Sequence, residues 1–255
     1  LGAFVLVPPL IRRVLAPVAL PPESFPAGSP RHESRVRLRY RHLAAHPRLF
    51  ARLKMHLDPM FPHLASFVSA PRRILDIGCG IAVPSVWLTE LFPQARVHGI
   101  DPDEERIRVA RQAIGPRGEM RTGRAPELDD LPEEADTALV LDLIHMLDEA
   151  AWRRTLAVLH AKLITGGRLI LRATVPADRP FPWKRRLEEF RLKSHRLAPH
   201  YRSRTAIMAG IAAAGFDLET VEADGPGSEE VWFVAVRSPS DPVEEASRTS
   251  EGVRP

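Results

Sequence analysis

The stretch Arg73-Ile74-Leu75-Asp76-Ile77-Gly78-Cys79-Gly80, followed further along by Arg96-Val97-His98-Gly99-Ile100-Asp101, decides the fold of this chain. Together they predict a buried strand, a glycine turn, a connecting helix and a second strand that ends in a carboxylate. In such a unit the glycines let the backbone approach a bound nucleoside closely, and the carboxylate accepts hydrogen bonds from ribose hydroxyls. The sequence therefore predicts a nucleoside-cofactor site.

The residues after the turn argue against a dinucleotide. A dinucleotide fingerprint has a third glycine three residues after Gly80, where a helix N-terminus faces the pyrophosphate. This chain has Val83 at that position, followed by Pro84. A nicotinamide-dependent oxidoreductase is therefore disfavoured.

The remaining pattern, Asp76-x-Gly78-x-Gly80, resembles the first motif of the class I S-adenosylmethionine-dependent methyltransferases. In that family the acidic residue orients the glycine loop around the amino-acid end of the cofactor, and the acid after the second strand binds the ribose. The resemblance implies that S-adenosylmethionine is the cofactor. It also implies a set of cofactor-binding residues: Asp76, Gly78, Cys79, Gly80, Asp101, Pro102, Arg124, Ala125 and Asp142.

Three later segments extend the resemblance to roughly residues 60 to 237. Gly123-Arg124-Ala125-Pro126 lies where the third strand of the family ends, residues 135–142 look like its fourth strand, and residues 163–171 look like the turn into its fifth. A domain with this third-strand sequence is also similar to methyltransferase domains fused to bacterial lipid-exporter membrane proteins.

At two positions the chain departs from the family pattern. Ala82 stands where the family often has a third glycine, and Arg124 stands where it often has an aspartate that accepts a hydrogen bond from adenine. A guanidinium group cannot accept a hydrogen bond. Adenine would then be held by backbone groups near Ala125, by packing against Pro102, or in a way that differs from the family.

The alternation of strands and helices predicts an α/β, Rossmann-like, doubly wound fold. With the resemblance, we expect a seven-stranded, mostly parallel sheet with an antiparallel last strand and an N-terminal helical extension, whose helices break at Pro47 and Pro59. We expect a leader and linker over residues 1–30, helices that cover the pocket over 31–70, the catalytic domain over 71–237 and a disordered tail over 238–255.

The ends and the composition bear on location. The apolar run Leu1–Ile11, which precedes Arg12 and Arg13, is either the end of a membrane span from a longer protein or a proline-broken surface segment. Cys79 is the only cysteine, which excludes an internal disulfide and favours a cytoplasmic protein or one at the cytoplasmic face of the inner membrane. The sequence indicates no oligomeric state.

The segment after the fourth strand, Asp142-Leu143-Ile144-His145, lies where a methyl acceptor would meet the cofactor. It lacks the Asn-Pro-Pro-aromatic and Pro-Cys patterns of enzymes that methylate nucleic-acid bases, so a nucleic-acid substrate is disfavoured. His145 is the candidate catalytic base because an imidazole titrates near neutral pH; alternatively, it only shapes the pocket. The ten histidines show no paired ligand spacing, so we expect no metal site.

Several other polar residues are candidates for the pocket. Tyr40, Lys54, His56 and Asp58 could line it, or could lie on a solvated helix face. The arginines between Arg35 and Arg41 are interpreted as juxtamembrane or as attracting an anionic acceptor, and Phe181–Arg186 as part of a lid.

Two functions therefore stay open. The first is O- or C-methylation of a small-molecule or lipid-linked acceptor. The second, favoured by Ala82 and Arg124, is a non-catalytic domain that binds S-adenosylmethionine or S-adenosylhomocysteine and is appended to a membrane protein.

Overall fold

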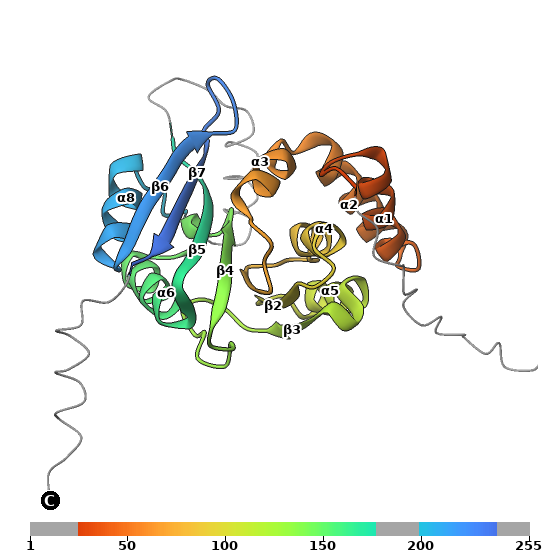
Figure 1. Ribbon diagram of the computed structural model, residues 1–255, viewed down its shortest axis with the longest axis horizontal. Coiled ribbons are helices and arrows are strands. Elements are labelled where there is room, and N and C mark those ends of the chain that lie inside the picture. The colour runs from red at the N-terminus through yellow and green to blue at the C-terminus, as the bar shows by residue number, and fades with distance from the viewer. Residues whose placement is uncertain (1–24, 177–198, 239–255) are drawn as a thin grey trace, which may run out of the picture.

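A computed structural model describes residues 25–176 and 199–238 of the 255-residue chain. These residues form one seven-stranded sheet with helices on both faces (Figure 1). The predictions for the leader, the lid segment Phe181–Arg186 and the tail beyond residue 238 lie outside the described residues. The strands are β1 (Arg73–Ile77), β2 (Arg96–Asp101), β3 (Gly118–Thr122), β4 (Ala135–Leu141), β5 (Leu163–Thr174), β6 (Phe216–Ala223) and β7 (Glu230–Arg237).

The strand order is β3-β2-β1-β4-β5-β7-β6. Neighbours from β3 to β5 pair in parallel, and β7 pairs antiparallel with both β5 and β6. The last strand therefore lies inside the sheet, where Trp232 and Phe233 are fully buried. This arrangement confirms the predicted fold class.

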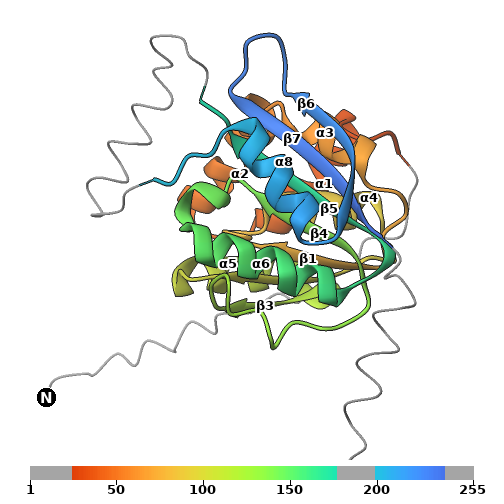
Figure 2. The same cartoon turned by 90° about the vertical axis from the view of Figure 1, so that its left-hand side faces the viewer.

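The helices form two layers. They are α1 (Pro30–Tyr40), α2 (Ala45–Leu57), α3 (Met60–Phe67), α4 (Val83–Leu91), α5 (Glu104–Ile114), α6 (Glu149–Lys162) and α8 (Arg204–Ala213), with short 3-10 turns η1 (Gly115–Arg117) and η2 (Ile144–Met146). One layer packs α1 to α5 against side chains such as Ile74. The other packs α6 and α8 against its neighbour Leu75, and both helices face the viewer in Figure 2. Because successive strand residues point to opposite faces, both faces of the sheet are buried.

The predicted helix break at Pro47 is wrong. Pro47 is the third residue of α2, in the first turn, where its missing N–H has no helical partner to lose. The chain turns earlier, at residues 41–44. The break at Pro59 is confirmed, since α2 ends at Leu57 and α3 begins at Met60.

A buried carboxylate holds α1 against α4. The side chain of Glu90, which is 0% exposed, pairs with Arg35 at 2.9 Å, Arg39 at 2.5 Å and Arg117 at 3.0 Å. Burial alone would raise the pKa of Glu90, but the charges of Arg39 and Arg117 and the hydrogen bonds from Arg35 and Arg39 outweigh it and lower that pKa. Arg35 and Arg39 are therefore used inside the protein. The interpretation of these two arginines as juxtamembrane or acceptor-attracting groups is wrong.

Candidate active site

The glycine loop after β1 is tied to the end of β2. The N–H groups of Gly78 and Cys79 both donate to the carbonyl of Ile100, at 2.8 and 2.9 Å. Gly78 and Gly80 have φ angles of 79° and 55°, which glycine adopts without a steric penalty. A Cβ atom added to Gly80 would meet no atom within 4 Å. The loop is thus fixed from one side and open to a ligand at Gly80.

Asp101 braces this loop. One carboxylate oxygen accepts the N–H of Gly80 at 3.0 Å, and the other accepts the N–H of Asp103 at 3.0 Å. Arg106 lies 3.9 Å from the first oxygen. The structure therefore brings Asp101 to the glycine loop, as the motif spacing predicts, and adds a bracing contact that the spacing did not reveal.

Asp76 lies beneath the loop and is only 2% exposed. The hydroxyl of Ser85, on α4, donates to it at 2.5 Å. Burial raises the pKa of Asp76 to about 6, the Ser85 hydrogen bond opposes this rise, and the charge of Asp101 adds to it. Ser85 was missed from sequence because one hydroxyl in a helix gives no signal of its partner.

The remaining loop residues are held by packing. Cys79 is buried, and burial raises the pKa of its thiol, which therefore stays protonated. Ala82 is fully buried with a φ of 63°, so it adopts the left-handed conformation that a glycine would favour. The buried Tyr40 donates its hydroxyl to the carbonyl of Ile81 at 2.9 Å, which brings this candidate from α1 to the loop.

A second group of residues follows β4. Asp142 has a φ of 55°, and one of its carboxylate oxygens accepts a hydrogen bond from Arg172 at 2.8 Å. Its other carboxylate oxygen, Oδ1, is buried without a hydrogen-bond partner in the described part of the chain. His145, in η2, is 5% exposed, and its ring stacks on Tyr201 with 6.0 Å between the centroids.

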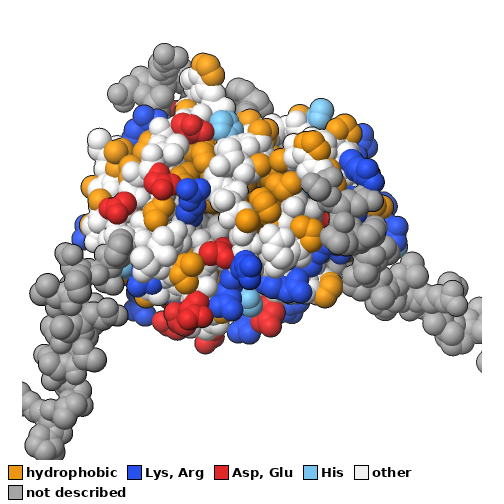
Figure 3. Space-filling model, viewed as in Figure 1, with side chains coloured by type: hydrophobic (Ala, Val, Ile, Leu, Met, Phe, Trp, Pro, Cys, Tyr) orange, Lys and Arg blue, Asp and Glu red, His pale blue; other side chains and the backbone are white. Residues whose placement is uncertain are grey.

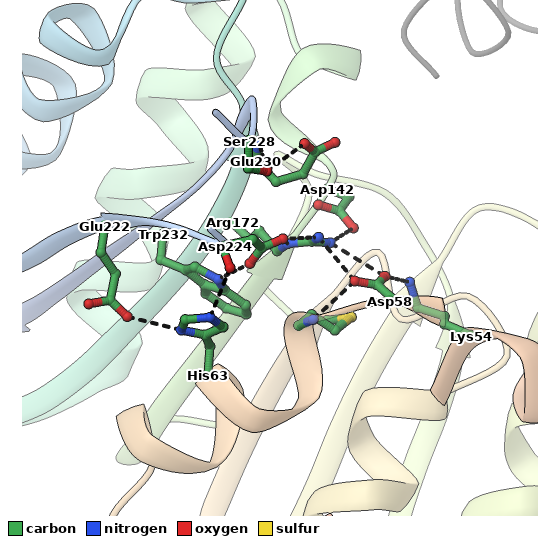
Figure 4. A network of polar contacts seen from close by, with 11 residues as sticks. Lys54, Asp58, His63, Asp142, Arg172, Glu222, Asp224, Ser228, Glu230 and Trp232 are labelled. Atoms are coloured by element: carbon green, nitrogen blue, oxygen red, sulfur yellow. Dashed lines mark hydrogen bonds and ion pairs between the residues drawn. The ribbon is translucent and has the colours of Figure 1, made fainter. Parts of the chain in front are cut away.

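Arg172 is the centre of a polar network that sequence reasoning missed (Figure 4). Its guanidinium group contacts Asp58 at 3.0 Å, Asp142 at 2.8 Å and Asp224 at 2.5 Å, and it lies over the ring of Trp232. Burial alone would lower the pKa of Arg172, but the carboxylates raise it. The available signal was an arginine that directly follows the apolar run Leu169–Leu171.

The candidates on α2 separate into two kinds. Asp58 joins the network, and Lys54 pairs with it at 2.9 Å. His56 is exposed and takes no part in this network. The end of α2 therefore reaches the Arg172 network, while His56 stays on the outside.

Pro102 and Arg124 line a cavity of about 370 Å³ beyond the ends of β2 and β3. Its apolar walls include Ile100, Leu128 and Leu131, and its charged lining residues are Arg121, Arg124, Glu127 and Asp130. Ala125 follows Arg124 and packs against the core between the sheet and the layer of α6 and α8. An apolar slot with polar edges has the character of a nucleobase site.

The residues present fit S-adenosylmethionine chemically. Gly80 offers backbone that a ligand can approach, Asp101 offers a carboxylate to ribose hydroxyls, and the cavity offers apolar walls to adenine. The buried Oδ1 of Asp142 offers a hydrogen-bond acceptor to a ligand.

Comparison with known proteins agrees with this fit. Residues 74–167 match the family described as "Methyltransferase domain". Trans-aconitate 2-methyltransferase from Rhodopseudomonas palustris (strain BisB5) is 43% identical over 47 residues, which are 18% of each chain. The matched stretch therefore spans less than a fifth of that relative's length.

Solved structures share the fold at low identity. An S-adenosylmethionine dependent methyltransferase from Mesorhizobium loti has a TM-score of 0.57 and 21% identity, covering 71% of this chain and 99% of its own. Human N-acetylserotonin methyltransferase, solved with its cofactor, has a TM-score of 0.60 and 16% identity, covering 82% of this chain and 57% of its own. Residues 74–167 therefore match a methyltransferase domain, and the chain shares the fold of S-adenosylmethionine-dependent methyltransferases.

Proposed function

We propose that this protein transfers the methyl group of S-adenosylmethionine to an oxygen or carbon atom of a small-molecule or lipid-linked acceptor. One observation carries the proposal: β1 and β4 are parallel neighbours, so the glycine loop after β1 and the segment Asp142–His145 after β4 lie at the same edge of the sheet. Ligands of open α/β sheets bind at this edge.

The chain's own residues would hold the cofactor as follows. The loop from Gly78 to Gly80 would take its amino-acid end, with Asp76 fixing the loop from below and Asp142 contributing from the side. Asp101 would bind the ribose. Pro102, Arg124 and Ala125 would hold the adenine. When bound, the cofactor supplies a methyl group on a sulfonium, which an aligned acceptor atom can displace.

His145 is the group that could take a proton from a hydroxyl acceptor. Its ring is buried and stacks on Tyr201, which keeps water away from it. Excluding water strengthens the electrostatic interactions between the reacting groups. A base is needed only for an acceptor that must lose a proton.

The Arg172 network bears on the charge of the acceptor. Three carboxylates already occupy the guanidinium group, so it is not free to bind an anion. An anionic acceptor such as trans-aconitate, which the relative's name specifies, would meet the carboxylates of Asp58, Asp142 and Asp224. We therefore propose an acceptor that is uncharged at its reacting end.

The cysteine content bears on where the protein works. A single buried cysteine suits a reducing compartment. We propose that the protein works in the cytoplasm or at the cytoplasmic face of the inner membrane.

Calorimetric titration with S-adenosylmethionine, S-adenosylhomocysteine and NAD tests the cofactor. Release of S-adenosylhomocysteine in the presence of phenolic, hydroxyl and acyl-linked acceptors tests transfer. We expect the first two compounds to bind and NAD not to bind. His145→Gln should lower turnover on a hydroxyl acceptor by about 100-fold, and the exposed His42→Gln should not.

Either step can contradict the proposal. If neither S-adenosylmethionine nor S-adenosylhomocysteine binds, the cofactor assignment is wrong. Binding without turnover on any acceptor would instead support the non-catalytic cofactor-binding domain.

A further inference from the structure

Helix α2 has apolar side chains on two opposite faces. Its inner face packs Pro47, Ala51 and Met55 into the protein. At 3.6 residues per turn, a second stripe lies on the far side of the helix. That stripe consists of Leu49, Phe50, Leu53 and Leu57, which are 56%, 46%, 44% and 67% exposed.

Single exposed leucines are ordinary on protein surfaces, but an exposed stripe on one helix indicates an interaction surface. In the space-filling view, hydrophobic and basic side chains lie beside one another at the upper right, near the place where Figure 1 has α2 (Figure 3). The contacts of the described residues therefore leave this stripe largely on the outside.

The charges beside the stripe are all of one sign. Residues 45–57 contain no acidic residue. His46, Arg48, Arg52 and His56 are exposed, and neither Arg48 nor Arg52 forms an ion pair within the described part of the chain. Lys54 is the exception, since it pairs with Asp58. The stripe is thus flanked by positive charge that no neighbouring carboxylate balances.

We propose that the α2 surface, made of Leu49, Phe50, Leu53 and Leu57 with Arg48 and Arg52 beside them, docks on an anionic lipid surface. A helix with an apolar face and flanking Lys or Arg lies in the membrane interface, with the apolar side chains in the acyl boundary and the cations near anionic headgroups. None of the helices among the described residues is long and apolar enough to cross a bilayer. At 13 residues, α2 is shorter than the roughly 20 residues that a spanning helix needs, so it would lie on the surface of the bilayer.

A second copy of the chain fits this surface less well. In a two-fold dimer the same patch meets itself, so Arg48 and Arg52 of the two copies would come together. Stable dimers also bury roughly 800 Å² on each partner, more than four partly exposed side chains offer. Charge and size both favour the lipid surface.

Docking would also place the active site. Leu57 precedes Asp58, whose carboxylate contacts Arg172. Arg172 in turn contacts Asp142, at the edge of the sheet where we propose that methyl transfer takes place. A docked α2 would hold this edge close to the membrane. That consequence rests on the proposed function, whereas docking itself does not.

Flotation with phosphatidylcholine vesicles, with and without phosphatidylglycerol, tests the proposal on the full chain. We expect binding to the anionic vesicles that weakens with salt. Leu53→Ser with Leu57→Ser should weaken binding at least tenfold, on the order of the loss expected for two apolar side chains. Arg48→Gln with Arg52→Gln should weaken it about fivefold for each charge removed.

The matched control is Ile164→Ser. Ile164 is 42% exposed at the start of β5, away from α2, so its substitution should leave vesicle binding unchanged. Hydrogen exchange then locates the contact: anionic vesicles should protect residues 45–57. Circular dichroism and thermal unfolding confirm that each variant is folded.

Three results would overturn the proposal. These are unchanged vesicle binding in the leucine double variant, equal binding to neutral and anionic vesicles, and a stable dimer in solution that the leucine substitutions dissolve. Because no cofactor or acceptor is present in this experiment, its failure leaves the proposed function untouched.

Discussion

The hydroxyl of Tyr40 donates a hydrogen bond to the carbonyl of Ile81 at 2.9 Å, across 41 residues of sequence. Tyr40 ends α1, and Ile81 lies in the glycine loop. An N-terminal helix therefore fixes the conformation of the loop that would receive the cofactor.

Tyr40→Phe tests this connection. Removing the hydroxyl leaves the Ile81 carbonyl without this donor, so we expect a loss of about 1 kcal/mol in unfolding free energy and a several-fold weaker affinity for S-adenosylhomocysteine. Urea unfolding and calorimetry measure the two effects. Arg37→Gln, which breaks an exposed pair with Glu33 on the same helix, should change neither appreciably. If both variants changed stability and affinity equally, the hydrogen bond from Tyr40 would not be what fixes the loop.

Asp101→Ala tests the ribose assignment. It removes the carboxylate that we propose for the ribose and also the brace on Gly80, so cofactor affinity should fall by about 1 to 3 kcal/mol. Asp103→Asn keeps a side chain that can cap α5 and serves as the neighbouring control. Unchanged affinity in Asp101→Ala would reject the role of this residue.

Asp76→Asn tests the buried carboxylate through pH. The folded pKa of about 6 lies above the ordinary value of 3.8, so the folded protein holds the proton more tightly than the unfolded chain. Stability should therefore decline as pH rises from about 4 to about 6, by about 3 kcal/mol in total. Asp76→Asn should flatten this part of the stability curve in urea unfolding.

Ser85→Ala supplies the check on that reasoning. The Ser85 hydrogen bond holds the pKa of Asp76 down, so its loss should move the decline to higher pH. A curve that is the same in wild type, Asp76→Asn and Ser85→Ala would contradict the assignment of the titration to Asp76.

The fold followed from patterns that are local in sequence. Helix α5 spans Glu104–Ile114 because Asp103 caps its start and Gly115 follows its end, and both signals are local in the sequence. Strand β4 (Ala135–Leu141) lies within residues 135–142, the segment that resembles the family's fourth strand, and Ala135 already pairs with Leu163 of β5. The predicted break at Pro47 was wrong because proline interrupts a helix in its interior but is tolerated in its first turn.

The site was only partly predictable. The glycine loop and Asp101 carry a motif whose spacing fixes which strands they follow. Arg172, in contrast, takes its partners from 114, 30 and 52 residues away, at Asp58, Asp142 and Asp224. No local pattern encodes which distant carboxylates will meet a buried arginine, since tertiary packing decides it.

Arg172→Met tests the energetic role of that network. It leaves Asp58, Asp142 and Asp224 near one another without their shared cation, so we expect a loss of about 3 to 5 kcal/mol in unfolding free energy. Arg168→Met, on the same strand but in a partly exposed pair with Glu219, should cost less than about 1 kcal/mol. Urea unfolding measures both variants.

The pH dependence of Arg172→Met gives a further readout. Burial alone would raise the pKa of Asp58, but the charges of Lys54 and Arg172 lower it. The ion pair between Asp58 and Arg172 therefore stabilises the fold at pH values above the ordinary carboxyl pKa, and this stabilisation is lost as pH falls. The deficit of Arg172→Met should therefore be larger at neutral pH than near pH 4. A deficit that does not change with pH would indicate lost packing rather than lost charge pairing.

The position of β7 has a consequence for biosynthesis. This strand is the last of the seven in the sequence, yet it lies between β5 and β6 and buries Trp232 and Phe233. Until the ribosome has released residues 230–237, β5 and β6 each present an open edge that could pair with another nascent chain. The sheet can close only late in translation, so a frameshift or early stop before Glu230 would produce an aggregation-prone chain even though every cofactor motif is already present.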